Sequence, residues 1–195
     1  MTEHFYDRLG NETLTRDPLW VASSPLAHTT QKFYDGAGRL IREINGAGDV
    51  KEYGYDVFDR RTEVRLVGST RTLTHEMAYD HRDRLAQYTD AEDFVTHFQY
   101  DKRDNRTGTQ DGRGHWTYQD YDGLNRVTQT RYLQNGVQVS EKRQYDAYGN
   151  LIAQTDGAGR TQSTVYGEFG RKMAEIDAAG REIRYEYDDF GNLIR

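Results

Sequence analysis

Polar and apolar residues alternate over short stretches of this chain, and no stretch has the spacing of a long amphipathic helix. The alternation is clear in Val137-Gln-Val-Ser and in Tyr185-Glu-Tyr. The stretches are about six or seven residues long and rich in Thr, Val, Ile and Tyr, which is typical of β-strands. The pattern therefore predicts an all-β protein built from many short strands.

A Tyr-Asp pair, or a close relative of it, recurs along the chain. The pairs begin at positions 6, 34, 55, 79, 100, 121, 145, 166 and 187, so the steps from position 34 onward are 21, 24, 21, 21, 24, 21 and 21 residues. Fixed self-similarity of this kind indicates an array of one repeated structural unit. From position 34 onward each repeat begins with a tyrosine, and we interpret these tyrosines as structural repeat residues. They are Tyr34, Tyr55, Tyr79, Tyr100, Tyr121, Tyr145, Tyr166 and Tyr187.

Four residues after each repeat tyrosine stands a Gly, Asp or Asn, the residue types that adopt a left-handed backbone at least cost. An Asp precedes this position by three residues in eight of the nine units, Gly167 being the exception. Asp-x-x-Gly is typical of a type I turn, and a left-handed residue after it predicts a bulged hairpin. The predicted left-handed positions are Gly38, Asp59, Asp83, Asp104, Asn125, Gly149, Gly170 and Gly191, with Gly10 in the first unit.

A second reversal follows eleven residues after the tyrosine, as in Asn45-Gly-Ala-Gly48 and Asp156-Gly-Ala-Gly159. The two 24-residue units carry tighter hairpin signals instead, Asn135-Gly136 for a type I′ turn and Gly68-Ser69 for a type II′ turn. Their hairpins should therefore be taller. Each unit is predicted to be two antiparallel strands, and the fold to be a continuous antiparallel β-hairpin meander. Strand twist favours an array that curls into a wall or strip, polar on both faces.

The first unit differs from the others because 28 residues separate its tyrosine from the next. The excess contains Pro18, Pro25 and Trp20, so we interpret residues 1–33 as an atypical N-terminal repeat with a proline-containing loop. That loop is either a surface loop or a cap over a sheet edge. Residues 34–195 form the repeat array, whose last unit is incomplete, so the sequence fits either a piece of a longer chain or an edge that has a partner.

Composition changes this picture little. Charged residues make up 30% of the chain and the mean hydropathy is −1.00, values that alone would suggest disorder. Fifteen tyrosines and the strict repeat argue for a folded sheet, because tyrosine combines a large apolar ring with a polar tip. The net charge of −6 argues against nucleic-acid binding. There is no cysteine, no signal-peptide pattern and no apolar run of membrane length.

No catalytic constellation emerges from the sequence. The six histidines lack metal-ligand spacing, each repeated Asp stands where a turn needs it, and the Gly-Ala-Gly-Arg segments lack the rest of a phosphate loop. We therefore predict no catalytic residues, no metal and no cofactor. Arginines recur after the first turn, and they either form a cross-strand network that supports the sheet or a ladder that holds sugars or polypeptide. These arginines are Arg39, Arg60, Arg84, Arg126 and Arg171.

Three segments now carry a resemblance: Tyr34-Asp-Gly-Ala-Gly-Arg-Leu-Ile, Tyr121-Asp-Gly-Leu-Asn-Arg-Val and Tyr145-Asp-Ala-Tyr-Gly-Asn-Leu-Ile. Each is followed by a second turn, and together they resemble the YD repeats of Rhs proteins. The wider family includes the C components of bacterial toxin complexes, wall-associated proteins and teneurins. The resemblance covers residues 34–195 and extends weakly to the first unit.

The resemblance implies a β-strip that spirals into a hollow shell around a toxin polypeptide. The self-cleaving Asp-Pro core segment typical of bacterial members is not seen here, so no protease role is carried over. We expect a non-catalytic shell segment whose partners are polypeptide, either toxin cargo or further Rhs shell, or copies of itself through sheet edges. We also expect a bacterial protein that is cytoplasmic before export and leaves by a route without a signal peptide. The alternatives are a carbohydrate- or protein-binding β-repeat module and an orphan Rhs remnant.

Overall fold

The computed structural model describes residues 1–22, 24, 27–68 and 70–195. The chain falls into an N-terminal half, Met1–His97, and a C-terminal half, Phe98–Arg195. The described residues contain seventeen β-strands and one short 3-10 turn, η1 (Glu168–Gly170). The predicted all-β fold is therefore confirmed. None of the described residues forms a helix long and apolar enough to cross a membrane.

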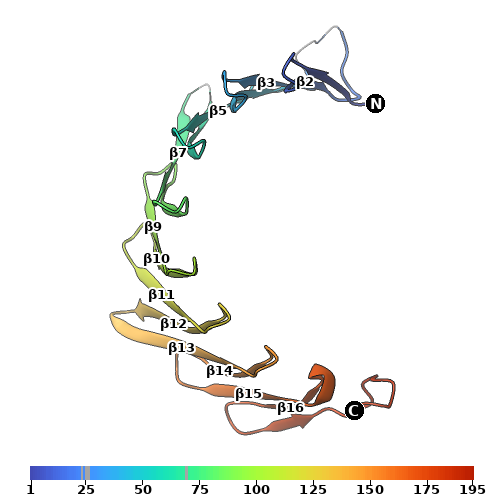
Figure 1. Cartoon of the computed structure of the whole chain (residues 1–195), viewed down its shortest axis with the longest axis vertical. Helices are drawn as coiled ribbons and strands as arrows, with labels where there is room; N and C mark the ends of the chain where they lie inside the picture. The colour runs from blue at the N-terminus through green and yellow to red at the C-terminus, as the bar shows by residue number, and fades with distance from the viewer. Residues whose placement is uncertain (23, 25–26, 69) are drawn as a thin grey trace. The chain divides into compact units, whose positions relative to one another are not determined.

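Each strand is antiparallel to the strand that follows it in sequence, so the predicted hairpin meander is confirmed as well (Figure 1). The first nine strands are β1 (Glu3–Tyr6), β2 (Glu12–Arg16), β3 (Thr29–Tyr34), β4 (Leu40–Asn45), β5 (Val50–Tyr55), β6 (Arg61–Val67), β7 (Thr72–Tyr79), β8 (Leu85–Thr89) and β9 (Val95–Tyr100). The remaining strands are β10 (Arg106–Gln110), β11 (Trp116–Tyr121), β12 (Val127–Gln134), β13 (Val137–Tyr145), β14 (Leu151–Thr155), β15 (Thr161–Tyr166), β16 (Lys172–Ile176) and β17 (Glu182–Arg184).

Each repeat tyrosine from Tyr6 to Tyr166 is the last residue of an odd-numbered strand, and a turn follows that we call the first turn of its unit. In the first turn after Tyr34 the N–H of Asp35 donates to the carbonyl of Arg39, and the N–H of Gly38 donates to the carbonyl of Asp35, both over 3.0 Å. The strand register shifts at the tyrosine, between Phe33 and Tyr34. This is the bulged hairpin that a type I turn and a left-handed residue produce.

The second turn of each regular unit uses the same chemistry. In the turn between β4 and β5 the N–H of Gly48 donates to the carbonyl of Asn45 over 2.9 Å, and Gly48 has φ +87°. Two taller hairpins, β6–β7 and β12–β13, have strands of seven to nine residues where most others have five or six. Asn135 and Gly136 at the tip of β12–β13 have φ +52° and +78°, as a type I′ turn requires. The predicted type II′ turn at Gly68-Ser69 includes a residue outside the described part of the chain.

The extra length of the first unit lies inside its second turn. Asp17 stands eleven residues after Tyr6, and its N–H donates to the carbonyl of His28 over 2.9 Å, closing the connection between β2 and β3. Asp17 Oδ1 accepts the N–H of Leu19 over 2.7 Å, and His28 has φ +60°. The unit thus keeps the repeat and carries an insertion between Asp17 and His28. Pro25, part of the predicted loop, lies outside the described residues.

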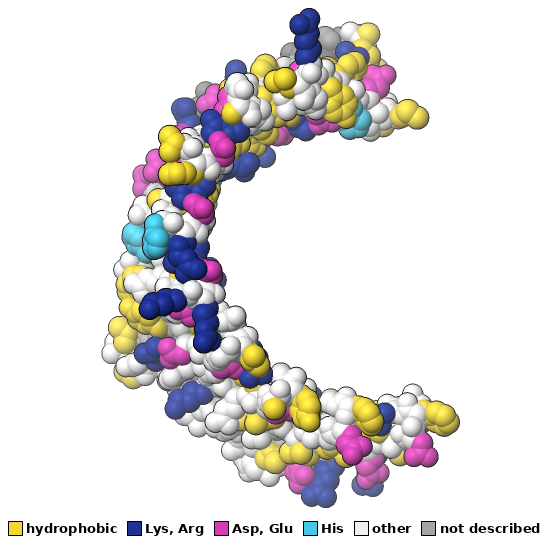
Figure 2. Space-filling view, in the orientation of Figure 1, with side chains coloured by type: hydrophobic (Ala, Val, Ile, Leu, Met, Phe, Trp, Pro, Cys, Tyr) yellow, Lys and Arg dark blue, Asp and Glu magenta, His cyan; other side chains and the backbone are white. Residues whose placement is uncertain are grey.

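The sheet has little dry core. Val139, Ala174 and Thr29 are buried, and no large side chain of the described residues is fully buried. Val139 is covered because Gly157, in the turn between β14 and β15, lies so close that a methyl group there would overlap it. Figure 2 shows charged side chains of both signs spread over the visible face of each half. Stability must therefore come from backbone pairing and half-buried rings more than from aliphatic packing.

Candidate functional site

The repeat tyrosines link one hairpin to the next. The hydroxyl of Tyr55 donates to the carbonyl of Leu40 over 2.8 Å, and Leu40 is the first residue of β4 in the preceding hairpin. A carbonyl at a bulge lacks its regular ladder partner, so the tyrosine hydroxyl satisfies it while the ring covers the hairpin below. The same bond joins Tyr34 to Glu12, Tyr79 to Arg61, Tyr121 to Arg106, Tyr145 to Val127 and Tyr187 to Lys172, over 2.7–3.2 Å. Tyr100 and Tyr166 end β9 and β15.

The turn aspartates are fully used within their turns. Asp80 Oδ1 accepts the N–H groups of Arg82 and Arg84 over 2.8 and 3.0 Å, and its Oδ2 accepts Nε of Arg84 over 2.8 Å. The Arg84 guanidinium, supported by these backbone N–H groups, lowers the pKa of Asp80 to about 2. The backbone N–H and the guanidinium of Arg39 lower the pKa of Asp35 in the same way. These carboxylates are turn caps.

The arginines that follow the first turns connect neighbouring turns. Arg60 Nε donates to Asp56 in its own turn over 2.7 Å, while its Nη1 reaches Asp83 Oδ1 over 2.7 Å and the Asp80 carbonyl over 3.2 Å in the next turn. Its guanidinium also lies 4.9 Å from the ring centre of Tyr79. Arg39 and Arg126 make the corresponding contacts to the rings of Tyr55 and Tyr145, at 5.0 and 4.6 Å. Of the two interpretations of the arginine ladder, the contacts support the cross-strand network.

The predicted left-handed positions carry positive φ angles. Their φ values lie between +61° and +95° at Gly38, Asp59, Asp83, Asp104, Asn125, Gly149, Gly170 and Gly191. Asp59 and Asp83 additionally accept Nη1 of Arg39 and Arg60 from the preceding unit, each over 2.7 Å. An aspartate at this position therefore serves both the turn and the link between turns.

One first turn differs from the rest, and the sequence signals it through Gly167. Without the aspartate, the turn between β15 and β16 becomes the 3-10 turn η1, and Phe169 takes φ +61° next to Gly170 at φ +70°. Arg171 has no carboxylate partner in this turn, and its guanidinium lies 5.7 Å from the Phe169 ring centre and 5.8 Å from that of Tyr187. A phenylalanine in the left-handed region is strained.

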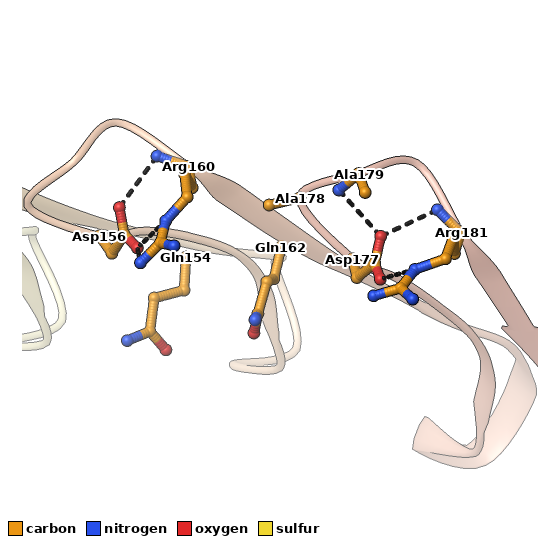
Figure 3. A pocket seen from close by; sticks show the side chains of 8 residues that line it. All are labelled: Gln154, Asp156, Arg160, Gln162, Asp177, Ala178, Ala179 and Arg181. Carbon is orange, nitrogen blue, oxygen red and sulfur yellow. Dashed lines mark hydrogen bonds and ion pairs between the residues drawn. The ribbon is translucent and has the colours of Figure 1, made fainter.

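A cavity of about 530 Å³ lies along the second turns of the C-terminal half, and Figure 3 shows the side chains that line it. Asp156 bonds Arg160 in the turn between β14 and β15, and Asp177 bonds Arg181 in the turn between β16 and β17, through Nε contacts of 2.8 and 2.6 Å. Each carboxylate is satisfied by its own turn, so neither is placed to act as a base on a bound molecule. Among the described residues no group of three or more His, Asp or Glu is placed to hold a metal ion.

An aromatic cavity that the sequence analysis did not single out lies on β11, β12 and β13. The rings of Trp116 and Tyr118 lie nearly parallel, with centres 5.5 Å apart, and the guanidinium of Arg131 lies 6.0 Å from the Tyr118 ring centre. Leu133 and Gln138 line the same cavity of about 380 Å³. The alternation of Trp116 and Tyr118 along one strand was the available signal, because residues two apart share a face.

Half-buried tyrosines, capped turns and linked hairpins define a β-hairpin repeat protein. The RHS Repeat family model matches residues 34–71, 79–115 and 145–182, which is more than half of the chain. The chain belongs to the RHS-repeat family, as the YD motifs predicted.

One solved structure shares the fold. A structure of the Photorhabdus luminescens Tc holotoxin pore with a TccC3 mutation matches 99% of this chain and 12% of its own, with a TM-score of 0.53 and 15% identity. Crystal structures of TcdB2-TccC3 and of TcdB2-TccC3-Cdc42 match 99% of this chain and 14% of theirs, with TM-scores of 0.48 and 0.47 and 13% identity. This chain therefore spans a small part of the length of the chains it resembles.

Proposed function

We propose that this chain is a non-catalytic wall segment of an Rhs shell that encloses and sequesters a toxin polypeptide. The observation that carries the proposal is the repeated link between hairpins, in which repeat tyrosines and the arginines after the first turns bond a neighbouring hairpin. Such a wall can be lengthened unit by unit without a dry core, because each hairpin is held by the next. Membership of the RHS-repeat family and the fold shared with a Tc holotoxin chain support this role.

The wall chemistry also suits a polypeptide that is not folded. Charged side chains of both signs lie among apolar ones on the visible face, and large apolar side chains such as Phe58, Phe94 and Tyr148 are exposed. An unfolded polypeptide can contact such a mixed surface at many separate points. We place the protein in bacterial cytoplasm before export and assign its release to a route without a signal peptide.

A segment exchange tests this function. The part of the P. luminescens Tc chain that aligns with this chain is replaced by residues 1–195, and the protection of an enclosed polypeptide from added protease is measured. We expect the chimera to keep its cargo protected. A matched chimera with Tyr145→Ala should leak, because a link between hairpins is lost. A folded, soluble chimera whose cargo is digested as fast as free polypeptide would contradict the proposal.

The aromatic cavity favours a second candidate, a carbohydrate-binding module. Parallel rings such as Trp116 and Tyr118 offer apolar faces for sugar stacking, and Arg131 and Gln138 supply hydrogen-bond donors beside them. Binding to a glycan array that is lost in Trp116→Ala and kept in Tyr148→Ala would support this function. An orphan remnant without independent activity would show neither cargo protection nor glycan binding.

A further inference from the structure

The first turns of the C-terminal half, Phe98–Arg195, project on the same side of their strands, where they form one row of tips (Figure 1). The third residue after each repeat tyrosine stands at the tip. We define the tip row as these five residues of the C-terminal half: Arg103, Leu124, Tyr148, Phe169 and Phe190. The four apolar members are exposed by 68%, 93%, 89% and 91% in chain order.

The turn itself does not require an apolar residue at this position. Leu9, Ala37, Phe58 and Arg82 occupy it in the N-terminal half, and Arg103 occupies it in the C-terminal half. All five turns keep the aspartate-capped hydrogen bonds, whether the residue is apolar, small or charged. The Tyr148 turn has the same bonds, with Asp146 Oδ1 accepting the N–H of Tyr148 over 2.9 Å. A ring on a tip therefore contributes little to the hairpin, while exposing it to water is unfavourable.

Phe169 adds an independent observation. It is held at φ +61° in η1 and yet is 89% exposed, so the strained backbone presents the ring to solvent. The guanidinium of Arg171 lies 5.7 Å from the centre of this ring. Strain at an exposed aromatic residue is typical of a recognition site.

The charge of the two central residues of the first turn changes sign along the row. These residues are basic at Lys102 and Arg103, where Nη1 of Arg103 also donates to the Gly123 carbonyl over 3.2 Å, and they include an acidic residue, Glu168 or Asp189, beside Phe169 and Phe190. Tyr148 occupies the middle of the five tips. A second row running in the opposite direction would place Tyr148 against Tyr148, Leu124 against Phe169, and Arg103 against Asp189 and Phe190. The row is thus complementary to itself under a two-fold axis, as an isologous contact requires.

We propose that the tip row is an interface at which a second copy of this chain docks antiparallel, with Tyr148 at the two-fold axis. The apolar tips supply the contact, and the pairing of Arg103 with Asp189 and the Phe190 ring fixes its direction. Five tips make a small surface, so the dimer is weak and dissociates on dilution. This inference is independent of the shell function.

Charge reversal in the full chain tests the interface by sedimentation velocity over a range of concentrations. Arg103→Glu and Asp189→Lys each place like charges opposite each other twice in a homodimer, and each should weaken dimerisation by about tenfold or more. A mixture of the two variants should dimerise like the unchanged protein, because every 103–189 contact in the mixed dimer is again between opposite charges. Phe169→Ser with Phe190→Ser should abolish dimerisation.

Arg113→Glu is the matched control, since it makes the same charge change on an exposed second turn of the C-terminal half and should leave dimerisation unchanged. Circular dichroism of each variant separates loss of contact from loss of fold. A chain that stays monomeric at all concentrations overturns the proposal, and so does a dimer that the single charge reversals do not weaken. Binding of an unrelated polypeptide to the tip row by a monomeric chain would likewise overturn it in favour of a different partner.

Discussion

The two edges of the hairpin array use the same bulged turn but differ in how they join neighbouring hairpins. At the first-turn edge, Arg60 and Arg84 are 21% and 17% exposed, and Arg60 reaches into the next turn. At the second-turn edge, Arg160 and Arg181 are 71% and 84% exposed and bond the aspartate of their own turn. Arg71 is a second-turn arginine that does cross, donating to the Ala91 carbonyl over 3.1 Å.

The difference shows that local turn chemistry and linkage between hairpins are separate properties. An aspartate and a left-handed residue suffice to close either turn. Linkage is stronger where a ring lies beside the arginine: Arg60 crosses next to the ring of Tyr79, whereas Arg71 crosses as a side chain that is 61% exposed. Four substitutions or conditions test this comparison.

Removal of a linking tyrosine should have the largest effect. Tyr145→Ala loses the ring, the 3.2 Å bond to the Val127 carbonyl and the contact with Arg126, and should lower the free energy of unfolding by about 2–3 kcal/mol. Urea denaturation measures the loss. Tyr148→Ala, three residues away on an exposed tip, is the control and should change stability by less than about 0.5 kcal/mol. Equal effects would mean that the ring column does not hold the hairpins together.

Substitution of a left-handed glycine should cost the same at either edge. Gly149 in a first turn has φ +95° and Gly159 in a second turn has φ +80°. Valine at either position should lower the free energy of unfolding by about 1–2 kcal/mol, because a β-branched residue is strained there. Thermal denaturation measures it, with Ala147→Ser as the control. A cost confined to Gly149 would show that the two turns are not equivalent.

Removal of an arginine should distinguish the edges. Arg126→Ala loses the Asp122 pair, the 3.3 Å bond to the Asp146 carbonyl and the Tyr145 ring contact, and should lower the free energy of unfolding by about 1 kcal/mol. Arg160→Ala removes an exposed pair and should cost less than about 0.5 kcal/mol. Chemical denaturation of the two variants in parallel gives the difference. If both lose the same amount, the first-turn link contributes nothing beyond the turn.

Acid should weaken the turns, with a small effect per residue. The pKa of Asp80 falls from 3.8 to about 2 in the folded chain because of Arg84, and neighbouring turn aspartates shift in the same direction. Asp80 therefore stabilises the fold above about pH 4, and this contribution is lost as the pH falls through about 2. Melting temperatures measured from pH 6 downward should fall in that window. Asp80→Asn should reduce the slope, and an unchanged slope would show that this carboxylate does not couple to folding.

Sequence alone was sufficient for the strands, both turns and the tall hairpin at Asn135-Gly136, because these depend on contacts close in sequence. The family followed from the same residues. The place of the insertion after Asp17 could also have been predicted, because Asp17 stands eleven residues after Tyr6 and the second turn begins at the same spacing in the other regular repeats. The strained turn at Phe169 was marked by Gly167, although a missing aspartate does not say which geometry replaces it.

The linking contacts required the tertiary structure. Tyr145 bonds a carbonyl 18 residues away, and Arg60 reaches a carboxylate 23 residues away, so the register between hairpins decides both. The same holds for Val139, which is buried by Gly157, and for the side on which the tips project. Backbone conformation is set by neighbours along the chain, whereas exposure and partnership are set by whatever the sheet brings alongside.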